Sequence, residues 1–452
     1  MKKALVLILA PVLAHATLTP NLPGRGAQTI QHQRGEVCII PNKLAGAKYT
    51  DKDIKEEQKL CSFELEQNVA VCGKTNSTNP GLNFFSLPNG MTPAQAEGLS
   101  CVSPSKDEKI KKDAKYKLST SCSYTPSLLS YYHVSRFLGD INQVPVAVLR
   151  TVDRNTHIAI GQKAFASLKP TDGVIYQTWS SLLSSLRAGQ ASSKKDALFT
   201  DDFTHSYGAL QKVPHHDEFY KELFNNGTDR VAAFRDNNEV YKRLANGTAL
   251  RNMGMNQWTA VNLQEVLRMQ NAADMILMDT MLNQADRMGN IAYTVEAYQV
   301  VSENGQQKVK KLDELEDGQT YPVGVLQVKK MMMKDNDCGI NRGDIVKAAD
   351  GTIHLLNIFK KDGLLAGLKH FNPETYQRLL KLDALMATAD GKSFFKKETA
   401  MTDTDYASIK ENTDYAVQVL QAGCRNKSIS FDLDLDTQFT NVQKSFSCEL
   451  TQ

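Results

Sequence analysis

The stretch Asp279-Thr-Met-Leu-Asn-Gln-Ala-Asp-Arg-Met-Gly-Asn-Ile291 decides how the rest of the chain is interpreted. It places Asp286 and Arg287 side by side just beyond a long helical pattern, with Asn290 four residues after the aspartate. A carboxylate can take a proton from a hydroxyl, a neighbouring arginine can hold the loop, and an amide oxygen can face a metal ion. The pattern therefore predicts a reactive loop carried by a rigid helix.

The helical pattern before this loop predicts where its support begins and ends. Asn262 is followed three residues later by Glu265, which is the spacing of a capping box, so we expect Asn262 to cap the start of the helix. Apolar residues then recur on one stripe as far as Met281. This stripe predicts a helix that is buried inside a helical part of the molecule.

The composition is that of a folded, exported protein. The 452 residues are 41% hydrophobic and 23% charged, which is ordinary for a chain with two or more packed units. Residues 1–16 have the pattern of a signal peptide, with Lys2 and Lys3, an apolar run and Ala14-His-Ala16 at the cleavage site. We therefore expect a secreted or periplasmic protein. No later stretch reaches about eighteen apolar residues, so no membrane anchor is expected.

The net charge gives no reason to expect nucleic acid as a partner. Removal of Lys2 and Lys3 with the signal peptide lowers the formal charge from +3 to +1. A basic run at 109–117 is the main local exception, and a solvated face is the plainer interpretation of it. The sequence leaves the oligomeric state open.

The cysteines predict disulfide bonds. All eight follow the signal peptide, and an even number in an exported chain favours pairing. None of them lies in a C-x-x-C or at zinc spacing, so a zinc site is not expected. Five precede residue 125, which predicts a stapled amino-terminal region, and Cys424 with Cys448 could close the tail. The remaining pairing stays open.

Composition and periodicity divide the chain into five parts. They are the signal peptide (1–16), a loop-rich Cys-containing extension (17–105), a small β-rich lobe with one helix (106–170), a mainly helical lobe (171–400) and a C-terminal helix with a disulfide-closed tail (401–452).

The patterns also predict individual elements. Strands are expected at 115–119, 143–151, 157–165 and 321–328, and a hairpin at 291–312 around Asn304-Gly305. Helices are expected at 127–138, 174–186, 229–244, 373–386 and 404–422. After the strand at 321–328 the chain runs through a Lys- and Met-rich segment to Asp335 and Asp337.

Three segments resemble one family when taken together. Asn283-Gln-Ala-Asp-Arg-Met-Gly-Asn290 is similar to the N-x-D-R-H-x-x-N catalytic loop of atypical kinases, which include HipA-like and phosphatidylinositol kinase-like proteins. Ser127 to Pro145 resembles helix αC and the following segment of the secreted kinases of the Golgi casein kinase and Four-jointed type. Met333-Lys-Asp-Asn336 resembles their metal-binding Asp-Asn, and Lys117 stands where they have a nucleotide-binding lysine. The resemblance implies an α+β, bilobal protein-kinase-like fold with lobes at 106–170 and 171–400.

The resemblance also implies a function and a set of site residues. Asp286 would be catalytic, orienting or deprotonating an acceptor hydroxyl. Asp335 and Asn290 would hold Mg²⁺ or Mn²⁺, and Asp337 could supply a further carboxylate. Lys117 would bind the phosphates of ATP or another nucleoside triphosphate. The implied reaction is transfer of the γ-phosphate to a hydroxyl of a protein or glycan.

Departures from the family pattern support a second hypothesis, a kinase-like pseudoenzyme that acts as a nucleotide-sensing or protein-binding module. Met288 replaces the histidine of the loop, and Asn290 follows Asp286 by four residues where the family has five. No Asp or Glu lies between Ser119 and Gly139, so helix αC lacks the acid that would pair with the lysine. Transfer of the AMP portion and an unrelated disulfide-rich surface protein also stay open as alternatives.

Overall fold

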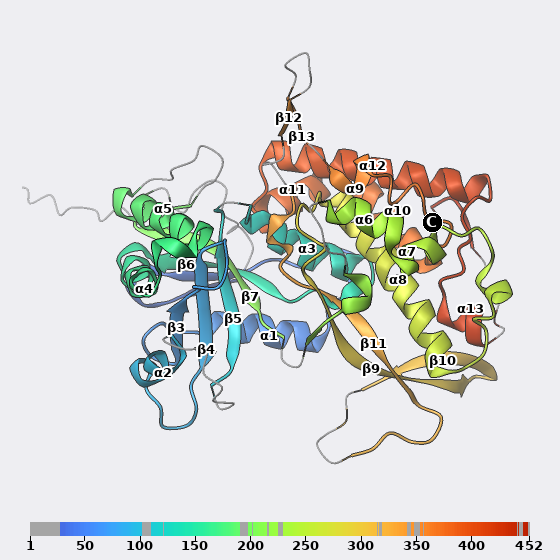
Figure 1. Cartoon of the computed structure of the whole chain (residues 1–452), viewed down its shortest axis with the longest axis horizontal. Coiled ribbons are helices and arrows are strands. Elements are labelled where there is room, and N and C mark those ends of the chain that lie inside the picture. The colour runs from blue at the N-terminus through green and yellow to red at the C-terminus, as the bar shows by residue number, and fades with distance from the viewer. Residues whose placement is uncertain are drawn as a thin grey trace, which may run out of the picture.

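The structure of this chain is a computed structural model that combines antiparallel sheets with a helical part (Figure 1). It describes residues 28–450 except 102–109, 121, 190–197, 201, 215–216, 225–228, 314, 316–318, 341–344, 348–352, 356, 441 and 443–445. The expected α+β class is confirmed. The expected signal peptide, 1–16, lies outside the described residues. In the part of the chain that is described, no helix combines the length and apolar character needed to cross a bilayer.

Seven of the described strands form one antiparallel sheet, which is drawn at the left of Figure 1. Across the sheet they are β1 (Gln28–Gln31), β2 (Val37–Ile40), β6 (Ala147–Asp153), β7 (His205–Lys212), β5 (Lys112–Leu118), β4 (Gly81–Ser86) and β3 (Val69–Gly73). Strands β3, β4 and β5 follow one another in the chain and in the sheet, so they form a meander. Strand β5 lies between β4 and β7, in the interior of the sheet.

The prediction that 17–105 is loop-rich is wrong for its described residues. This segment contributes β1 to β4 as well as α1 (Asp51–Cys61) and α2 (Pro93–Ser100). Its strands are four to six residues long, and β2 is buried along its whole length. A short buried strand such as β2 does not alternate between apolar and polar residues, so periodicity in the sequence does not predict it. The predicted domain boundaries stay predictions.

The prediction of a strand at 157–165 is also wrong, because these residues lie in helix α4 (Arg154–Ala166). Asp153 ends β6, and its carboxylate accepts a hydrogen bond from the backbone N–H of Thr156 at 2.8 Å. The strand therefore passes directly into a capped helix. The residues of α4 that are buried recur at helical spacing: Thr156, His157, Gly161 and Ala164.

Helices α4 and α5 (Val174–Ala188) cover one face of the large sheet. A Cβ atom at Gly73 of β3 would lie 2.5 Å from the Cβ of Ala164 and 3.1 Å from the ring of Trp179, so glycine permits this close approach. Helix α5 ends at Ala188 and is followed by Gly189, which is in the left-handed conformation, so the predicted helix at 174–186 is confirmed.

Helices α1 and α3 (Thr125–Phe137) cover the opposite face. Successive side chains of β5 point to opposite faces. The Tyr116 ring lies beside His157 of α4, with 6.0 Å between ring centroids. Asp113 forms an ion pair of 3.1 Å with Lys59 of α1. Lys117, which shares its face with Asp113, therefore points to the side of α1 and α3.

The helical part is built around α8 (Ala260–Met281), whose second half is fully buried. Thr259 caps this helix by accepting a hydrogen bond from the backbone N–H of Asn262, so the predicted cap at Asn262 is wrong by three residues. Helix α8 packs against α12 (Asp403–Arg425), which in turn packs against α10 (Pro373–Met386). The predicted helices at 373–386 and 404–422 are confirmed.

The single helix predicted at 229–244 is two helices, α6 (Arg230–Asn237) and α7 (Glu239–Leu244). Asn238 between them has extended backbone angles, and its side chain accepts a hydrogen bond from the backbone N–H of Val240. Asparagine caps helices well, so the chain ends one helix and begins another at this residue.

A second sheet carries the chain from the Asp286 loop to Asp335. Its strands are β8 (Glu218–Phe219), β9 (Ile291–Glu303), β10 (Gln306–Leu312) and β11 (Leu326–Met333). The hairpin predicted around Asn304-Gly305 is confirmed, with both turn residues at positive φ. The strand predicted at 321–328 begins later, at Leu326, and ends just before Asp335.

The remaining described elements are short. They are α9 (Ile358–Lys361), α11 (Ala389–Glu398), α13 (Leu435–Phe439), β12 (Ile345–Lys347), β13 (Ile353–Leu355) and the 3₁₀ turns η1 (Gln33–Gly35), η2 (Ile141–Gln143), η3 (Pro170–Asp172), η4 (Lys221–Leu223), η5 (Leu250–Met253) and η6 (Asn336–Cys338).

All eight cysteines are paired, as the sequence predicts. The bonds are Cys38–Cys61, Cys72–Cys101, Cys122–Cys338 and Cys424–Cys448. Three close loops of 23 to 29 residues, and the expected closure of the tail is confirmed. The bond Cys122–Cys338 spans 216 residues and joins the segment after β5 to the turn after β11. It therefore ties the large sheet to the second sheet.

Removal of the long-range disulfide is expected to destabilise the protein more than removal of the tail disulfide. A cross-link restricts the unfolded chain more when its loop is longer, which gives about 5 kcal/mol for Cys122–Cys338 and about 3.5 kcal/mol for Cys424–Cys448 in the loop-entropy description. Urea unfolding of the C122S/C338S and C424S/C448S double variants measures the difference. Equal loss in the two variants would show that the long bond adds no extra constraint.

Candidate functional site

The site is built from two turns that the fold brings together, one after α8 and one after β11. Helix α8 ends at Met281, and Asn283 then adopts a left-handed conformation with φ of 48°. Asp335 after β11 is also left-handed, with φ of 46°. The backbone N–H of Ala285 donates to the carbonyl of Cys338 at 3.0 Å, so the two turns are hydrogen-bonded to each other.

Arg287 is buried between these turns and holds both of them. Its guanidinium pairs with Asp279 of α8 at 2.8 Å and donates to the carbonyl of Lys334 at 2.9 Å. A further N–H donates to the side-chain oxygen of Asn336 at 2.6 Å. Tyr131 of α3 donates to the same Asp279 carboxylate at 2.7 Å, which brings a third element into the network. The predicted role of Arg287 as support for the loop is confirmed.

The burial of this network shifts the ionisation of its members. Burial raises the pKa of Asp279, and the charge and hydrogen bonds of Arg287 oppose that rise. Burial also raises the pKa of the Tyr131 hydroxyl, and the adjacent Asp279 adds to the effect. Arg287 and Asp279 are each fully inaccessible to solvent, so each is the required counter-charge of the other.

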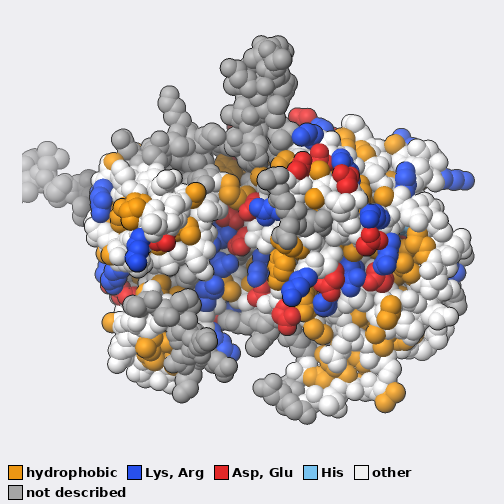
Figure 2. All heavy atoms as spheres, viewed as in Figure 1, with side chains coloured by type: hydrophobic (Ala, Val, Ile, Leu, Met, Phe, Trp, Pro, Cys, Tyr) orange, Lys and Arg blue, Asp and Glu red, His pale blue; other side chains and the backbone are white. Residues whose placement is uncertain are grey.

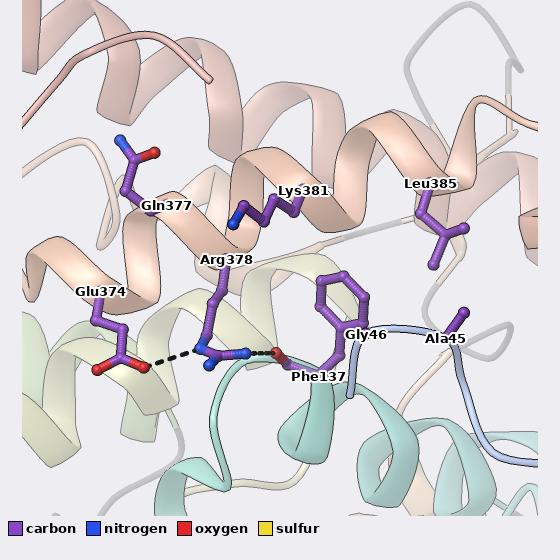
Figure 3. Close-up of a pocket in the computed structure, with 8 residues that line it drawn as sticks. All are labelled: Ala45, Gly46, Phe137, Glu374, Gln377, Arg378, Lys381 and Leu385. Atoms are coloured by element: carbon purple, nitrogen blue, oxygen red, sulfur yellow. Dashed lines mark hydrogen bonds and ion pairs between the residues drawn. The ribbon is translucent and has the colours of Figure 1, made fainter. Parts of the chain in front are cut away.

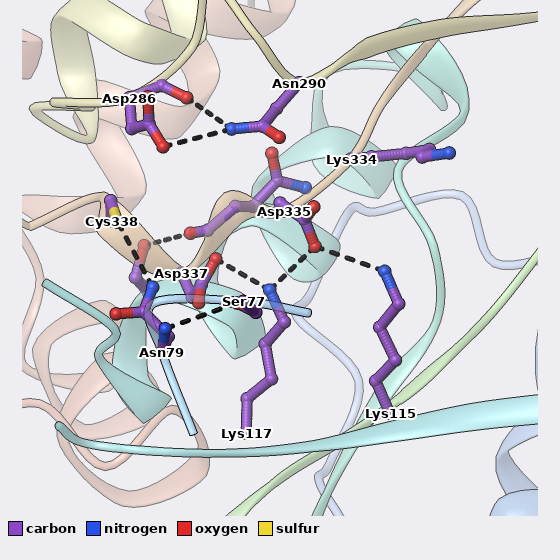
Figure 4. A network of polar contacts seen from close by, with 12 residues as sticks. Ser77, Asn79, Lys115, Lys117, Asp286, Asn290, Lys334, Asp335, Asp337 and Cys338 are labelled. Carbon is purple, nitrogen blue, oxygen red and sulfur yellow. Dashed lines mark hydrogen bonds and ion pairs between the residues drawn. The ribbon is translucent and has the colours of Figure 1, made fainter. Parts of the chain in front are cut away.

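Lys117 of β5 meets the turn after β11 directly (Figure 4). Its Nζ lies 2.7 Å from Oδ1 of Asp335 and 2.8 Å from Oδ1 of Asp337. These residues are 218 and 220 positions away in the sequence. Although burial alone would lower it, the two carboxylates raise the pKa of Lys117. The charge of Lys117 holds the pKa of Asp335 well below its usual value.

Further lysines surround this cluster and make it a cationic site. Lys115 lies two residues before Lys117 on the same face of β5, and its Nζ is 3.4 Å from Oδ1 of Asp335. Burial, with the nearby charge of Lys117, lowers the pKa of Lys74 to about 8. Lys74 follows β3 in the turn towards β4. Figure 2 shows basic and acidic side chains gathered in the hollow between the sheet part and the helical part.

Sequence reasoning missed both of these lysines. The alternation of β5 could have revealed Lys115, because residues two apart in a strand share a face. No comparable signal marks Lys74, since its approach to Asp335 depends on how β3 and β4 pack beside β5.

Asp286 lies at the rim of the same region and is half-exposed. Its carboxylate is 3.7 Å from the guanidinium of Arg230, and its side chain is 47% exposed. Burial of the rest of the carboxylate raises the pKa of Asp286, which Arg230 and a hydrogen bond from Asn290 partly offset. Figure 4 shows Asp286 and Asn290 on one side of Asp335, with Lys117 on the other.

Asn290 is turned back towards the loop that contains it. Its amide nitrogen donates to the main-chain carbonyl of Asp286 at 2.7 Å and lies 3.3 Å from Oδ2 of the same residue. The structure thus shows a contact with Asp286, and the metal-binding role of Asn290 stays a prediction. Met288, which replaces the family's histidine, is buried in the core.

Asp335 and Asp337, which follow β11, have carboxylates of the kind that bind a divalent cation such as Mg²⁺. One oxygen of Asp337, Oδ2, is buried without a hydrogen-bond partner, and Oδ1 of the same residue contacts Lys117. No group of three or more His, Cys, Asp or Glu side chains converges among the described residues. Mg²⁺ is commonly held by one or two carboxylates together with water and phosphate oxygens, so a pair of aspartates is sufficient.

Helix α3 is held in place without an acid that reaches Lys117. The hydroxyl of Ser127 donates to the carbonyl of Asn336 at 2.6 Å, next to the site. At the other end of the helix, Arg136 forms an ion pair with Asp53 of α1 at 2.7 Å. These contacts fix the helix at both ends, and α3 itself contains no Asp or Glu.

An open hollow at the surface shares no residue with this site (Figure 3). It lies between residues 45–46, the end of α3 and helix α10. Arg378 crosses it, donating to Glu374 at 3.1 Å and to the carbonyl of Phe137 at 3.2 Å. The charge of Arg378 at the centre of the hollow therefore already has protein partners.

Comparison with solved structures finds a distant likeness. The chain is similar to the solved structure of Fam20 from hydra, determined with a sugar, with 10% sequence identity and a TM-score of 0.41. The match covers 85% of this chain and 94% of the hydra chain. Fam20 is of the Golgi casein kinase family. No protein-family profile and no curated protein matches the sequence. At this distance the likeness assigns no role to any residue.

The adjacent residues Asp286 and Arg287 are expected to respond differently to substitution. R287Q leaves the Asp279 carboxylate buried without its counter-charge and should lower the free energy of unfolding by about 3–5 kcal/mol. D286N changes a half-exposed group and should alter it by about 0.5 kcal/mol or less. Urea unfolding measures both. A stable R287Q protein would contradict the role of Arg287 as the support of the two turns.

Proposed function

We propose that this chain is an exported, metal-dependent kinase that transfers the γ-phosphate of a nucleoside triphosphate to a hydroxyl of a protein or glycan. The observation that carries the proposal is the direct contact of Lys117 with Asp335 and Asp337, close to the Asp286 loop. Phosphoryl transfer depends on cations that gather charged oxygens and on a group that positions the acceptor. This site offers both within one cluster.

The arrangement of elements supports a bilobal protein-kinase-like fold. In protein kinases the phosphate-binding lysine lies on the third strand of the small lobe and helix αC follows it. Lys117 lies on the third strand of the meander β3-β4-β5, and α3 is the next helix. The turn between β3 and β4 has the place of the phosphate-covering loop, although it is rich in Asn and Ser rather than Gly. Helix α8 and its Asp286 loop belong to the large lobe.

Each predicted site residue has a part in the proposed reaction. Lys117 binds the phosphates of the nucleotide, and the neighbouring Lys115 and Lys74 add positive charge there. Asp335 and Asp337 would hold Mg²⁺ or Mn²⁺, with Asn290 as a further oxygen ligand. The metal would neutralise charge on the phosphate oxygens.

Asp286 acts on the acceptor. Its carboxylate orients the hydroxyl and takes its proton as the oxygen attacks the γ-phosphorus. A bond forms between the acceptor oxygen and the γ-phosphorus, and the bond from the γ-phosphorus to the bridging oxygen breaks. The nucleoside diphosphate leaves. Half-exposure of Asp286 lets an acceptor approach from solvent.

Export is supported by the four disulfide bonds, since such bonds persist in oxidising compartments. The signal-peptide pattern at 1–16 points the same way. Whether the protein is secreted or periplasmic depends on the cell that makes it.

A kinase-like pseudoenzyme is the second candidate. It is favoured by the absence of any acid in α3 and by the ion pairs of Lys117, which occupy the two carboxylates that would bind metal. A protein of this kind would bind nucleotide or a partner protein without transfer.

Incorporation of phosphate from nucleotide labelled at the γ position tests the first candidate. With Mn²⁺ or Mg²⁺ and an acceptor panel of protein and glycan hydroxyls, the wild type is expected to incorporate label. D286A and D335A should lower incorporation at least about a hundred-fold, because a positioned base and a metal ligand are both lost. Equal incorporation by all three proteins would contradict the assignment. Label from the α position would show transfer of AMP instead.

The K117M variant tests the binding of metal and nucleotide separately from the transfer of phosphate. While Lys117 is paired with Asp335 and Asp337, a cation has to displace it, so K117M is expected to bind Mn²⁺ more tightly than the wild type without nucleotide. The same variant should lose the stabilisation that Mn²⁺ with nucleotide gives to the wild type in a thermal-shift measurement. If Mn²⁺ with nucleotide stabilises the wild type but the wild type incorporates no phosphate, the pseudoenzyme is favoured. Identical Mn²⁺ binding by K117M and the wild type would show that Lys117 does not compete with the cation for Asp335 and Asp337.

A further inference from the structure

We propose that the disulfide Cys122–Cys338 is a redox switch for the turn that carries Asp335 and Asp337. Oxidation fixes this turn against the segment after β5, and reduction by a dithiol releases it. The inference rests on the proposed function in one respect, which is that the turn forms the site for metal and nucleotide. The bond itself and its surroundings are features of the fold.

The bond joins the segments that form the candidate site. Cys338 directly follows Asp337, whose Oδ1 lies 2.8 Å from Nζ of Lys117. Cys122 lies in the segment between β5, which carries Lys117, and α3. The backbone carbonyl of Cys338 also accepts a hydrogen bond at 3.0 Å from Ala285, in the loop after α8. A change at this bond therefore acts on the lysine, the carboxylates and the loop together.

The bond can be reached from solvent through Cys122. This residue is exposed, whereas its partner Cys338 is only 2% exposed. All eight cysteines lie in the described part of the chain, and the other six are buried or half-buried: Cys38, Cys61, Cys72, Cys101, Cys424 and Cys448. Thiol–disulfide exchange requires that the attacking thiolate reach one sulfur of the bond. Cys122–Cys338 is therefore the most accessible of the four bonds to a reductant.

A second part of the site contacts both sulfurs. The side-chain nitrogen of Asn79 lies 3.4 Å from Sγ of Cys122 and 3.9 Å from Sγ of Cys338 (Figure 4). The backbone N–H of Asn79 donates to the hydroxyl of Ser77 at 3.2 Å. Both residues belong to the turn between β3 and β4, which has the place of the phosphate-covering loop in the proposed function. Opening of the bond therefore also removes a contact of this turn.

The turn that contains Cys338 has a backbone conformation that its surroundings impose. Asp335 and Ile340 are both left-handed, with φ of 46° and 49°. Residues other than glycine seldom adopt this conformation, and for a β-branched residue such as isoleucine it is strained. The hydrogen bond of 2.8 Å from the backbone N–H of Tyr124 to the carbonyl of Asp337 helps to hold the turn. The disulfide is the covalent part of this restraint, so its reduction lets the turn relax.

The exchange reaction balances with a dithiol as the co-reactant. One thiolate of the dithiol attacks Sγ of Cys122, and the bond to Sγ of Cys338 breaks. The Cys338 sulfur leaves with the electron pair and takes a proton. The second thiol of the reductant then attacks the mixed disulfide and frees the Cys122 thiol. Two electrons and two protons pass to the protein, and the dithiol becomes a disulfide. In an exported setting, a thiol–disulfide exchange protein is the class of reductant that would supply the dithiol.

Limited reduction of the full chain with dithiothreitol tests the switch without metal or nucleotide. Freed cysteines are alkylated and identified by mass spectrometry, and backbone hydrogen exchange is measured on the same samples. Cys122 and Cys338 should be alkylated before the other six cysteines. Exchange should then become faster, on the order of ten-fold or more, in residues 335–340 and 74–80, and stay unchanged in the buried half of α8. Reoxidation should restore the slow exchange.

Two double variants serve as controls. C122S/C338S should show fast exchange at 335–340 without reductant, and reductant should change it no further. C424S/C448S lacks a bond far from the site, so it should respond to reductant as the wild type does. Because the reduced wild type is measured as well, the test does not depend on the folding of C122S/C338S.

Three results would overturn the proposal. They are unchanged exchange at 335–340 after Cys122 and Cys338 are reduced, earlier reduction of another bond, and loss of protection throughout the chain, which would mark the bond as purely structural. The reduced form should also bind Mn²⁺ with nucleotide on the order of ten-fold more weakly than the oxidised form. If the oxidised form does not bind nucleotide, the proposed function fails, and hydrogen exchange still decides whether the bond is a switch.

Discussion

The buried guanidinium of Arg287 is the interaction on which the rest of the site depends. It joins the end of α8, the carbonyl of Lys334 at the end of β11 and the side chain of Asn336 in the following turn. Without this guanidinium the Asp279 carboxylate would be buried without a counter-charge, at a cost on the order of 3–5 kcal/mol. The two turns that it joins are irregular, and Asn283 and Asp335 in them have left-handed backbone conformations. Asp286 and Asp337 each lie one residue from a member of this network. Two of the candidate site residues therefore border a buried structural ion pair.

A second constraint ties the large sheet to this centre. The disulfide Cys122–Cys338 and the hydrogen bond from the backbone N–H of Tyr124 to the carbonyl of Asp337 both join the segment after β5 to the turn after β11. Lys117 at the end of β5 is held against Asp335 and Asp337 by the same connection. A disulfide bond of this kind persists in an oxidising compartment. Motion between the two parts of the molecule would be restricted at the site.

Much of the fold could be predicted where one local rule dominates. Helix α10 has the predicted bounds, since Pro373 begins a strong periodic run, and the Asn304-Gly305 hairpin follows from turn chemistry. Helix α4 was mistaken for a strand because β-branched and aromatic residues outweighed its cap at Asp153. In the candidate site, the adjacent Asp and Arg predict Asp286 and Arg287 from the sequence. The positions of Lys74 near Asp335 and of Arg230 near Asp286 depend on packing between distant segments, which the sequence does not show. The pairing of Cys122 with Cys338 is beyond reach for the same reason.

We propose that Lys117, Asp335 and Asp337 together form one site for nucleotide and metal. Anomalous diffraction from crystals grown with Mn²⁺ and a non-hydrolysable nucleoside triphosphate tests it most directly. We predict a manganese peak about 2.1–2.2 Å from carboxylate oxygens of Asp335 and Asp337, with the Nζ of Lys117 moved from the carboxylates to the phosphates. Nucleotide bound elsewhere, or Lys117 still paired with both aspartates and no manganese between them, would contradict the claim.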